Sequence, residues 1–346
     1  MKRRYVLVCF VCALCMLLEI ALAGIKPPTI WAYQGDVAYY EQEGKIGLMG
    51  PKKAKITEPI FDAVTPFYYD NVAAVDQDGK LGLINKKGEW IFESTSTRAI
   101  EFYNGYAVVK HEGNKWSLIN TKGETIVEPK WYVWAAPYAC GFFAVDYGNE
   151  KGVGFVGLNG EPAFDGMTWQ HEIGYFSENL AAVWDGKEWG YINTEGEMQI
   201  PYQFGSAHAF SSGLAAVRMP ESAQWIFIDT NGEQRLSGNW DRADRFGEFD
   251  LAPVEMKEKW GFINTKGKLI IKANWDTASP FSSGLACVSR NDKYGFINKS
   301  GKIVLKLSWS YAASFVEGYA YVMHKDGWDG FINTKGKIVC RSIGGK

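Results

Sequence analysis

A pattern of the form Lys-Trp-Gly-Phe-Ile-Asn-x-x-Gly recurs along this sequence at a nearly constant spacing. Its best-formed copy spans residues 259–267, and its central glycine, Gly261, serves as an anchor for alignment. The nine equivalent positions, 34 to 37 residues apart, are Gly47, Gly82, Ser117, Gly154, Gly190, Ile226, Gly261, Gly295 and Gly330. A period of this length along nearly the whole chain indicates tandem copies of one small structural unit.

Each copy predicts three short β-strands. A block such as Phe-Ser-Ser-Gly-Leu-Ala-Ala-Val at 210–217 comes first, the Trp-Gly-Phe-Ile run follows, and a return run such as Lys-Leu-Ile-Ile at 268–271 ends the copy. Alternate residues of a strand face opposite sides, and here both sides are apolar, so we expect the middle strand to be buried on both faces. A block such as Trp-Asp-Thr-Ala at 275–278 predicts either a fourth edge strand or a connecting loop.

The Asn-Thr-Lys-Gly segment at 264–267 predicts a tight hairpin turn. Asn can accept hydrogen bonds from the backbone just after it, and Gly adopts a positive φ without a Cβ penalty. Gly261 lies in mid-strand, where glycine weakens a strand unless another group approaches its backbone closely. We therefore expect an aromatic ring or a neighbouring strand against Gly261. The tryptophans at periodic positions are expected in the core; they are Trp116, Trp189, Trp225, Trp240, Trp260, Trp275 and Trp309.

One such unit cannot bury both of its faces alone, so neighbouring units must stack. The predicted fold class is all-β, with about nine tandem hairpin or meander repeats of roughly 35 residues. Two arrangements satisfy the stacking: a closed, propeller-like ring, which we favour because it removes long exposed edges, and an open β superhelix or solenoid.

These motifs resemble those of WG-repeat proteins, a bacterial family also described by its KWG repeats. The resemblance is carried by Lys259-Trp260-Gly261, Trp189-Gly190, the repeated Gly-Phe-Ile-Asn-x-x-Gly, and the Phe-Ser-Ser-Gly-Leu-Ala and Trp-Asp-x-Ala blocks, over residues 30 to 341. The first and fourth copies depart most, because Lys53 replaces the turn glycine and Gly157 the turn asparagine. The resemblance implies a repeat architecture and carries no catalytic residues.

Residues 1–23 have the pattern of a secretory signal peptide. Lys2, Arg3 and Arg4 precede an apolar stretch over 5–18, and Ala-Leu-Ala at 21–23 fits a cleavage site. The apolar stretch is short for a membrane span, which needs about 20 residues. We expect residues 24–346 to form a single repeat domain that is secreted, periplasmic or on the cell surface and does not span a membrane. An uncleaved N-terminal membrane anchor is the alternative.

The composition excludes several classes of function. The formal charge is −2 for the whole chain and becomes −4 after cleavage, with no basic patch for nucleic acid. The cysteines left after cleavage, Cys140, Cys287 and Cys340, match neither a zinc site nor a dense disulfide framework. No catalytic residue, metal site or cofactor is predicted, because repetition accounts for nearly all polar groups. His208 is assigned to a packing position of the repeat.

The third and fourth copies break the pattern and hold the candidate ligand-binding residues, which are Trp131, Trp134, Trp169 and His171. Aromatic side chains supply contact area at protein and sugar sites. The leading hypothesis is an exported, noncatalytic scaffold that binds a protein or a cell-surface component. The alternative is a glycan-binding module that uses these irregular aromatic residues, and an enzyme is the least favoured class.

Overall fold

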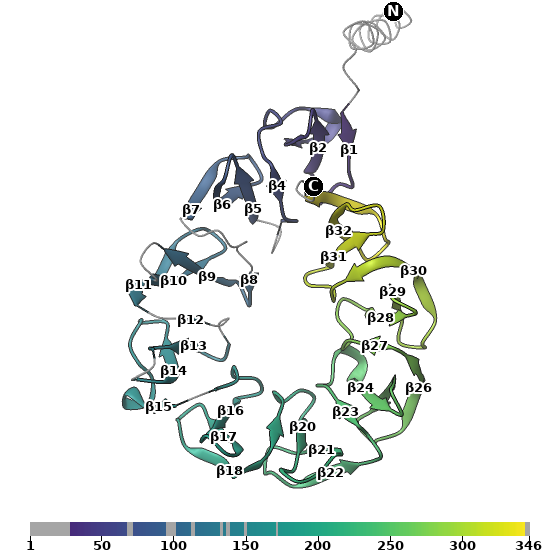
Figure 1. The fold of residues 1–346 in the computed structure, drawn as a ribbon. Coiled ribbons are helices and arrows are strands. Elements are labelled where there is room, and N and C mark those ends of the chain that lie inside the picture. The colour runs from purple at the N-terminus through teal and green to yellow at the C-terminus, as the bar shows by residue number, and fades with distance from the viewer. Residues whose placement is uncertain are drawn as a thin grey trace, which may run out of the picture.

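In the computed structural model, short antiparallel strands follow one another in nine repeat units around a common centre (Figure 1). The structure describes residues 28–67, 72–94, 102–111, 115–131, 134–135, 139–148, 151–170 and 172–342. Within these ranges the elements are strands and three short 3₁₀ turns, η1 (Pro51–Lys53), η3 (Phe164–Gly166) and η4 (Glu248–Asp250). None of the helical segments described could cross a membrane. The predicted signal peptide, 1–23, lies outside the described residues.

The first three units form one sheet each. The first sheet contains β1 (Thr29–Ile30), β2 (Ala38–Gln42) and β3 (Lys45–Met49). The second contains β4 (Ala63–Val64), β5 (Val72–Gln77), β6 (Lys80–Asn85) and β7 (Trp90–Ser94). The third contains β8 (Phe102–Tyr103), β9 (Tyr106–His111), β10 (Lys115–Asn120) and β11 (Thr125–Trp131). In the second and third units the first strand lies towards the centre and the last at the perimeter (Figure 1).

Units four to six continue this order. The fourth sheet contains β12 (Trp134–Ala135), β13 (Phe142–Asp146), β14 (Val153–Gly157) and β15 (Thr168–Trp169). The fifth contains β16 (Leu180–Trp184), β17 (Trp189–Asn193) and β18 (Met198–Phe204). The sixth contains β19 (Ser206–Ala207), β20 (Ala215–Arg218), β21 (Trp225–Ile228) and β22 (Gln234–Ser237). In the fifth unit an isolated bridge between Ile173 and Val183 takes the place of the inner strand.

The last three units end with a sheet that two of them share. The seventh contains β23 (Arg242–Ala243), β24 (Leu251–Met256), β25 (Lys259–Asn264) and β26 (Leu269–Trp275). The eighth and ninth contain β27 (Thr277–Ala278), β28 (Ala286–Arg290), β29 (Lys293–Ile297), β30 (Ile303–Ala312), β31 (Tyr319–His324), β32 (Asp329–Asn333) and β33 (Ile338–Ser342). The long strand β30 starts at the perimeter of the eighth unit and ends as the first strand of the ninth.

The last two residues of the Trp-Asp-x-Ala block form a fourth strand, so of the two alternatives predicted from sequence, an edge strand or a loop, the structure shows the strand. In the eighth unit Thr277 and Ala278 pair with Ser289 and Val288 of β28. Trp275, by contrast, still belongs to β26 of the seventh unit. Each such block therefore carries the chain from the perimeter of one unit to the inner strand of the next.

The predicted hairpin is confirmed in detail. The Asn264 side-chain oxygen accepts hydrogen bonds from the backbone N–H groups of Lys266 (3.1 Å) and Lys268 (3.0 Å), and Gly267 has a φ of 75°. Gly261 faces a bulge in β26, where the pairing passes from Trp260–Trp275 to Phe262–Ile271. The neighbouring strand is therefore the group that lies close to Gly261, as the pattern required.

The expectation that every periodic tryptophan is a core residue is correct only in part. Trp240 and Trp275 are buried, and Trp116 is slightly more exposed, at 9%. Trp189, Trp225, Trp260 and Trp309 are half-buried and pack against the rims of the hydrophobic clusters. Period 2 identifies the face on which a ring lies but not the depth of that ring.

The hydrophobic core is a series of clusters, most of which combine residues from two successive units. One cluster joins Phe262 and Trp275 of the seventh unit with Phe281 and Val288 of the eighth. Another joins Trp31 and Val37 near the N-terminal end with Val339 and Cys340 of β33. The first and last units are thus neighbours, as they are in Figure 1. Two further contacts join these ends: the Ala32 N–H donates to the Ile338 carbonyl (3.1 Å), and β33 contacts β2 and β4.

Candidate functional site

The four residues proposed from sequence occupy different environments. Trp169 is only 6% exposed, its ring packs edge-on against Phe155, and its indole N–H donates to the Tyr202 hydroxyl (3.1 Å). Trp131 ends β11 and Trp134 begins β12, but their side chains lie outside what the structure describes, as does the whole of His171. Trp169 is therefore a core residue in its described contacts, and a ligand surface formed by the four stays a prediction.

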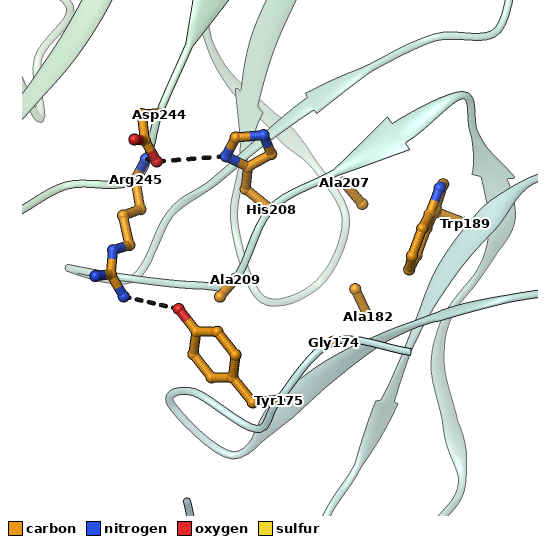
Figure 2. Close-up of a pocket in the computed structure, with 9 residues that line it drawn as sticks. All are labelled: Gly174, Tyr175, Ala182, Trp189, Ala207, His208, Ala209, Asp244 and Arg245. Atoms are coloured by element: carbon orange, nitrogen blue, oxygen red, sulfur yellow. Dashed lines mark hydrogen bonds and ion pairs between the residues drawn. The ribbon is translucent and has the colours of Figure 1, made fainter. Parts of the chain in front are cut away.

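A cavity of about 270 Å³ lies instead on the inner side of the fifth, sixth and seventh units (Figure 2). The fifth unit contributes Gly174, Tyr175, Ala182 and Trp189. The sixth contributes Ala207, His208 and Ala209, and the seventh contributes Asp244 and Arg245. Residues up to 71 positions apart in the sequence thus line one space.

The repeat places these side chains at equivalent positions. In each of the three units, a residue of the inner strand pairs with the valine of the next strand: Ile173 with Val183, Ala207 with Val217, and Ala243 with Val254. The two residues that follow each inner residue form what we call the inner-strand pair. In the three units that line the cavity, these pairs are Gly174–Tyr175, His208–Ala209 and Asp244–Arg245.

Three other described units carry only small residues or proline at the same pair. The equivalent pairs are Thr65–Pro66 in the second unit, Ser279–Pro280 in the eighth and Ala313–Ser314 in the ninth. The His208 ring packs against Trp225, in line with the packing position assigned from sequence, but the side chain is also partly exposed and lines the cavity. Alignment of these pairs would have revealed the site, because only the seventh unit among those compared has two charged residues there.

Small residues leave the space open. Gly174, Ala182, Ala207 and Ala209 present at most a methyl group, and Figure 2 shows them between Trp189 on one side and Arg245 with Tyr175 on the other. The Trp189 ring is half-buried and packs against the cluster formed by the fifth and sixth units. The cavity is thus apolar at the Trp189 end and polar at the Arg245 end.

The Asp244 carboxylate lies against the His208 imidazole at the polar end, with 3.4 Å between Asp244 Oδ1 and His208 Nδ1 (Figure 2). The backbone N–H of Arg245 also donates to Asp244 Oδ1 (2.7 Å). Burial alone would raise the pKa of Asp244, but the hydrogen bonds from His208 and Arg245 and the positive charges of both hold that pKa below its usual value. The Trp225 ring packs edge-on against the His208 imidazole, with 4.8 Å between centroids.

Arg245 donates from Nη1 to the Tyr175 hydroxyl on the same side of the cavity (2.7 Å; Figure 2). Its side chain is exposed, and Tyr175 is 39% exposed. The cavity lining contains no Ser, Cys or Lys nucleophile. Among the described residues, moreover, no group of three or more His, Cys, Asp or Glu could hold a metal ion. The arrangement suits recognition of a ligand by one cation, one phenol and one indole ring.

The fold and the repeated motifs define the class: an all-β repeat protein with propeller-like structural relatives. The WG-containing repeat family matches residues 46–80, 82–116, 116–150, 189–219, 225–260, 260–294 and 294–328. These segments cover more than half of the chain, so the chain belongs to the WG-containing repeat family. No curated protein matches the sequence.

Solved structures resemble this chain at low sequence identity. One match is a structure described as the eukaryotic initiation factor, with a TM-score of 0.56 and 13% sequence identity. The matched region covers 90% of this chain and 96% of the other chain. The computationally designed Ika8 protein has a TM-score of 0.49 and 11% identity, with 79% and 96% covered. BamB from Moraxella catarrhalis has a TM-score of 0.49 and 11% identity, with 76% and 93% covered. At these identities the likeness concerns the fold alone.

Proposed function

We propose that this chain is an exported, noncatalytic scaffold that binds a protein or a cell-surface component at the cavity formed by its fifth, sixth and seventh units. The observation that carries the proposal is the departure of three successive inner-strand pairs from the repeat, since these departures converge on one hollow. Polar side chains that converge in an otherwise apolar pocket are the usual mark of a ligand site.

The polar groups that do repeat have structural uses, which supports a scaffold rather than an enzyme. Asp276 accepts a hydrogen bond from the Asn291 N–H (2.7 Å) and forms an ion pair with Lys259 (2.6 Å). The Ser211 hydroxyl donates to the carbonyl of Phe246 in the next unit (2.7 Å). Such groups hold turns and successive units in place, which supports a structural role for these repeated residues.

We further propose that the nine units close into a propeller. The contacts of β33 with the first unit support this, because a shared cluster there buries Val339 completely. In a closed ring, Val339→Ala leaves a small cavity at the seam and increases hydrogen exchange in β1 to β3. The control is Val288→Ala, an equally buried valine between the seventh and eighth units. Unchanged exchange in β1 to β3 with Val339→Ala would favour the open superhelix.

The proposed export has its own test. Mass spectrometry of the protein from its producing cells is expected to show a mature chain that begins near Gly24. A full-length chain in the membrane fraction would instead support an N-terminal anchor.

Binding at the cavity is tested by a photo-crosslinking amino acid at Tyr175 in producing cells. The control carries the same crosslinker at Ile303, which has similar exposure (42%) but lies at the start of the perimeter strand β30. The proposal predicts a discrete cross-linked product from position 175 and none from position 303. Equal products from both positions, or none from position 175, would count against a binding site here.

A further inference from the structure

We propose that the cavity captures a carboxylate carried on an apolar group the size of one side chain. This inference rests on the proposed binding function and names the ligand chemistry of the same site. A peptide C-terminus that ends in an apolar residue offers this chemistry, and so does a small N-acylated amino acid.

The charge at the opening favours an anion. Asp244 and Arg245 are adjacent, but the Asp244 Oδ1 atom already lies 3.4 Å from His208 Nδ1 and accepts from the Arg245 backbone N–H. Among the described contacts, the Arg245 guanidinium makes one hydrogen bond, to the neutral Tyr175 hydroxyl. A guanidinium has five N–H donors in a planar fork that matches a carboxylate. The exposed cation is thus the group with unused binding capacity.

The opposite end of the cavity favours an apolar body. The half-buried Trp189 ring and the methyl groups of Ala182, Ala207 and Ala209 form this end. A volume of about 270 Å³ is just below the range of roughly 300–1,000 Å³ usual for drug-sized ligands, so it fits one side chain. An isolated phosphate would leave the apolar end empty and place a second negative charge beside Asp244.

The probes are N-acetyl-phenylalanine and its amide, which differ only in the carboxylate. Calorimetric titration of the mature protein is expected to show at least about tenfold tighter binding of the acid, since a charge-assisted hydrogen bond is stronger than a neutral one. N-acetylglycine and inorganic phosphate are expected to bind much more weakly than N-acetyl-phenylalanine. Equal binding of acid and amide would overturn the inference.

Two variants assign the binding to this cavity. Arg245→Ala removes an exposed side chain and is expected to weaken binding of the acid about tenfold or more, with no change in the amide. The matched control is Arg242→Ala in the same unit, whose side chain is 72% exposed and pairs with Glu255 outside the cavity lining. Ala209→Leu is expected to abolish binding by filling the space. Binding that survives Arg245→Ala and Ala209→Leu would overturn the assignment.

A pentapeptide that ends in phenylalanine separates the two sources of the carboxylate. Tighter binding of the peptide than of N-acetyl-phenylalanine supports a protein C-terminus as the ligand, whereas equal or weaker binding supports a small molecule. Failure of every carboxylate probe, with crosslinking at Tyr175 preserved, would refute this ligand class and leave the binding function standing. Failure of both would refute the two proposals together.

Discussion

Gly261→Ala tests how closely the strands of one unit approach each other. A Cβ at this position would lie 2.6 Å from the Ile271 carbonyl oxygen and 2.7 Å from the Ala273 nitrogen. Both are backbone atoms of β26, so the strand itself must shift. Overpacking of this kind costs about 1–3 kcal/mol. The loss of chain entropy in the unfolded state returns about 0.4–1 kcal/mol, which leaves a net destabilisation of about 1–2 kcal/mol.

The assay is equilibrium unfolding in urea, followed by far-ultraviolet circular dichroism. Gly50→Ala is the matched control, because Gly50 has an ordinary φ of −87° and a Cβ there would lie 3.5 Å from its nearest neighbour, Ile56 Cδ1, which is an ordinary contact. We expect Gly50→Ala to change the free energy of unfolding by no more than about 0.5 kcal/mol. Equal stability of the two variants would refute the argument that close backbone approach explains the repeated glycine.

Three further predictions follow from other contacts. Asn264→Ala removes two hydrogen bonds within the turn and is expected to cost about 1 kcal/mol in urea unfolding, whereas an unchanged midpoint would contradict the turn assignment. The lowered pKa of Asp244 means that its carboxylate, which faces His208 and Arg245, stabilises the fold above the ordinary carboxyl pKa of about 3.9. This contribution is lost as the pH falls through the lowered pKa of Asp244. The Asp244→Asn variant should therefore be less stable than the wild type at pH 6, and the two free energies of unfolding should become similar near pH 2. A difference in free energy of unfolding that does not change with pH would refute this prediction. Burial raises the pKa of the Cys287 thiol to about 12 and also raises the pKa of the Cys340 thiol. In the native protein, iodoacetamide should therefore label the exposed Cys140 at least about tenfold faster than Cys287 or Cys340, as measured by peptide mass spectrometry. Comparable labelling rates for the three cysteines would refute this prediction.

The repeat made much of the fold predictable. Turn chemistry is local, so Asn264 and Gly267 could be assigned to a hairpin from four consecutive residues. The need for close packing at Gly261 could also be predicted, because glycine in mid-strand requires a reason. The role of the Trp-Asp-x-Ala block could not, since it depends on pairing with a strand that follows some ten residues later, as Ala278 does with Val288.

The cavity could not be predicted from any single copy. His208, Asp244 and Tyr175 come from three units, and only their arrangement around a common centre brings them together. Trp169 shows that an irregular stretch of sequence does not reveal the depth of a ring, because the structure buries this one, while the ligand surface predicted with Trp131, Trp134 and His171 stays a prediction. We propose that the departures from the repeat that matter for binding are those at the inner-strand pairs, which converge on one cavity.

The central claim is that the repeat supplies the scaffold and that binding belongs to the inner-strand pairs that depart from it. The most direct measurement is the yield of cross-linked product from position 175 when the inner-strand pairs of the second, sixth, seventh, eighth and ninth units are replaced in turn by alanine. We predict that His208→Ala, which is the whole change in the sixth unit because residue 209 is already alanine, or replacement of Asp244–Arg245 abolishes the product. Replacement of Ser279–Pro280 or Thr65–Pro66 should leave the yield unchanged. Equal losses from all units would contradict the account.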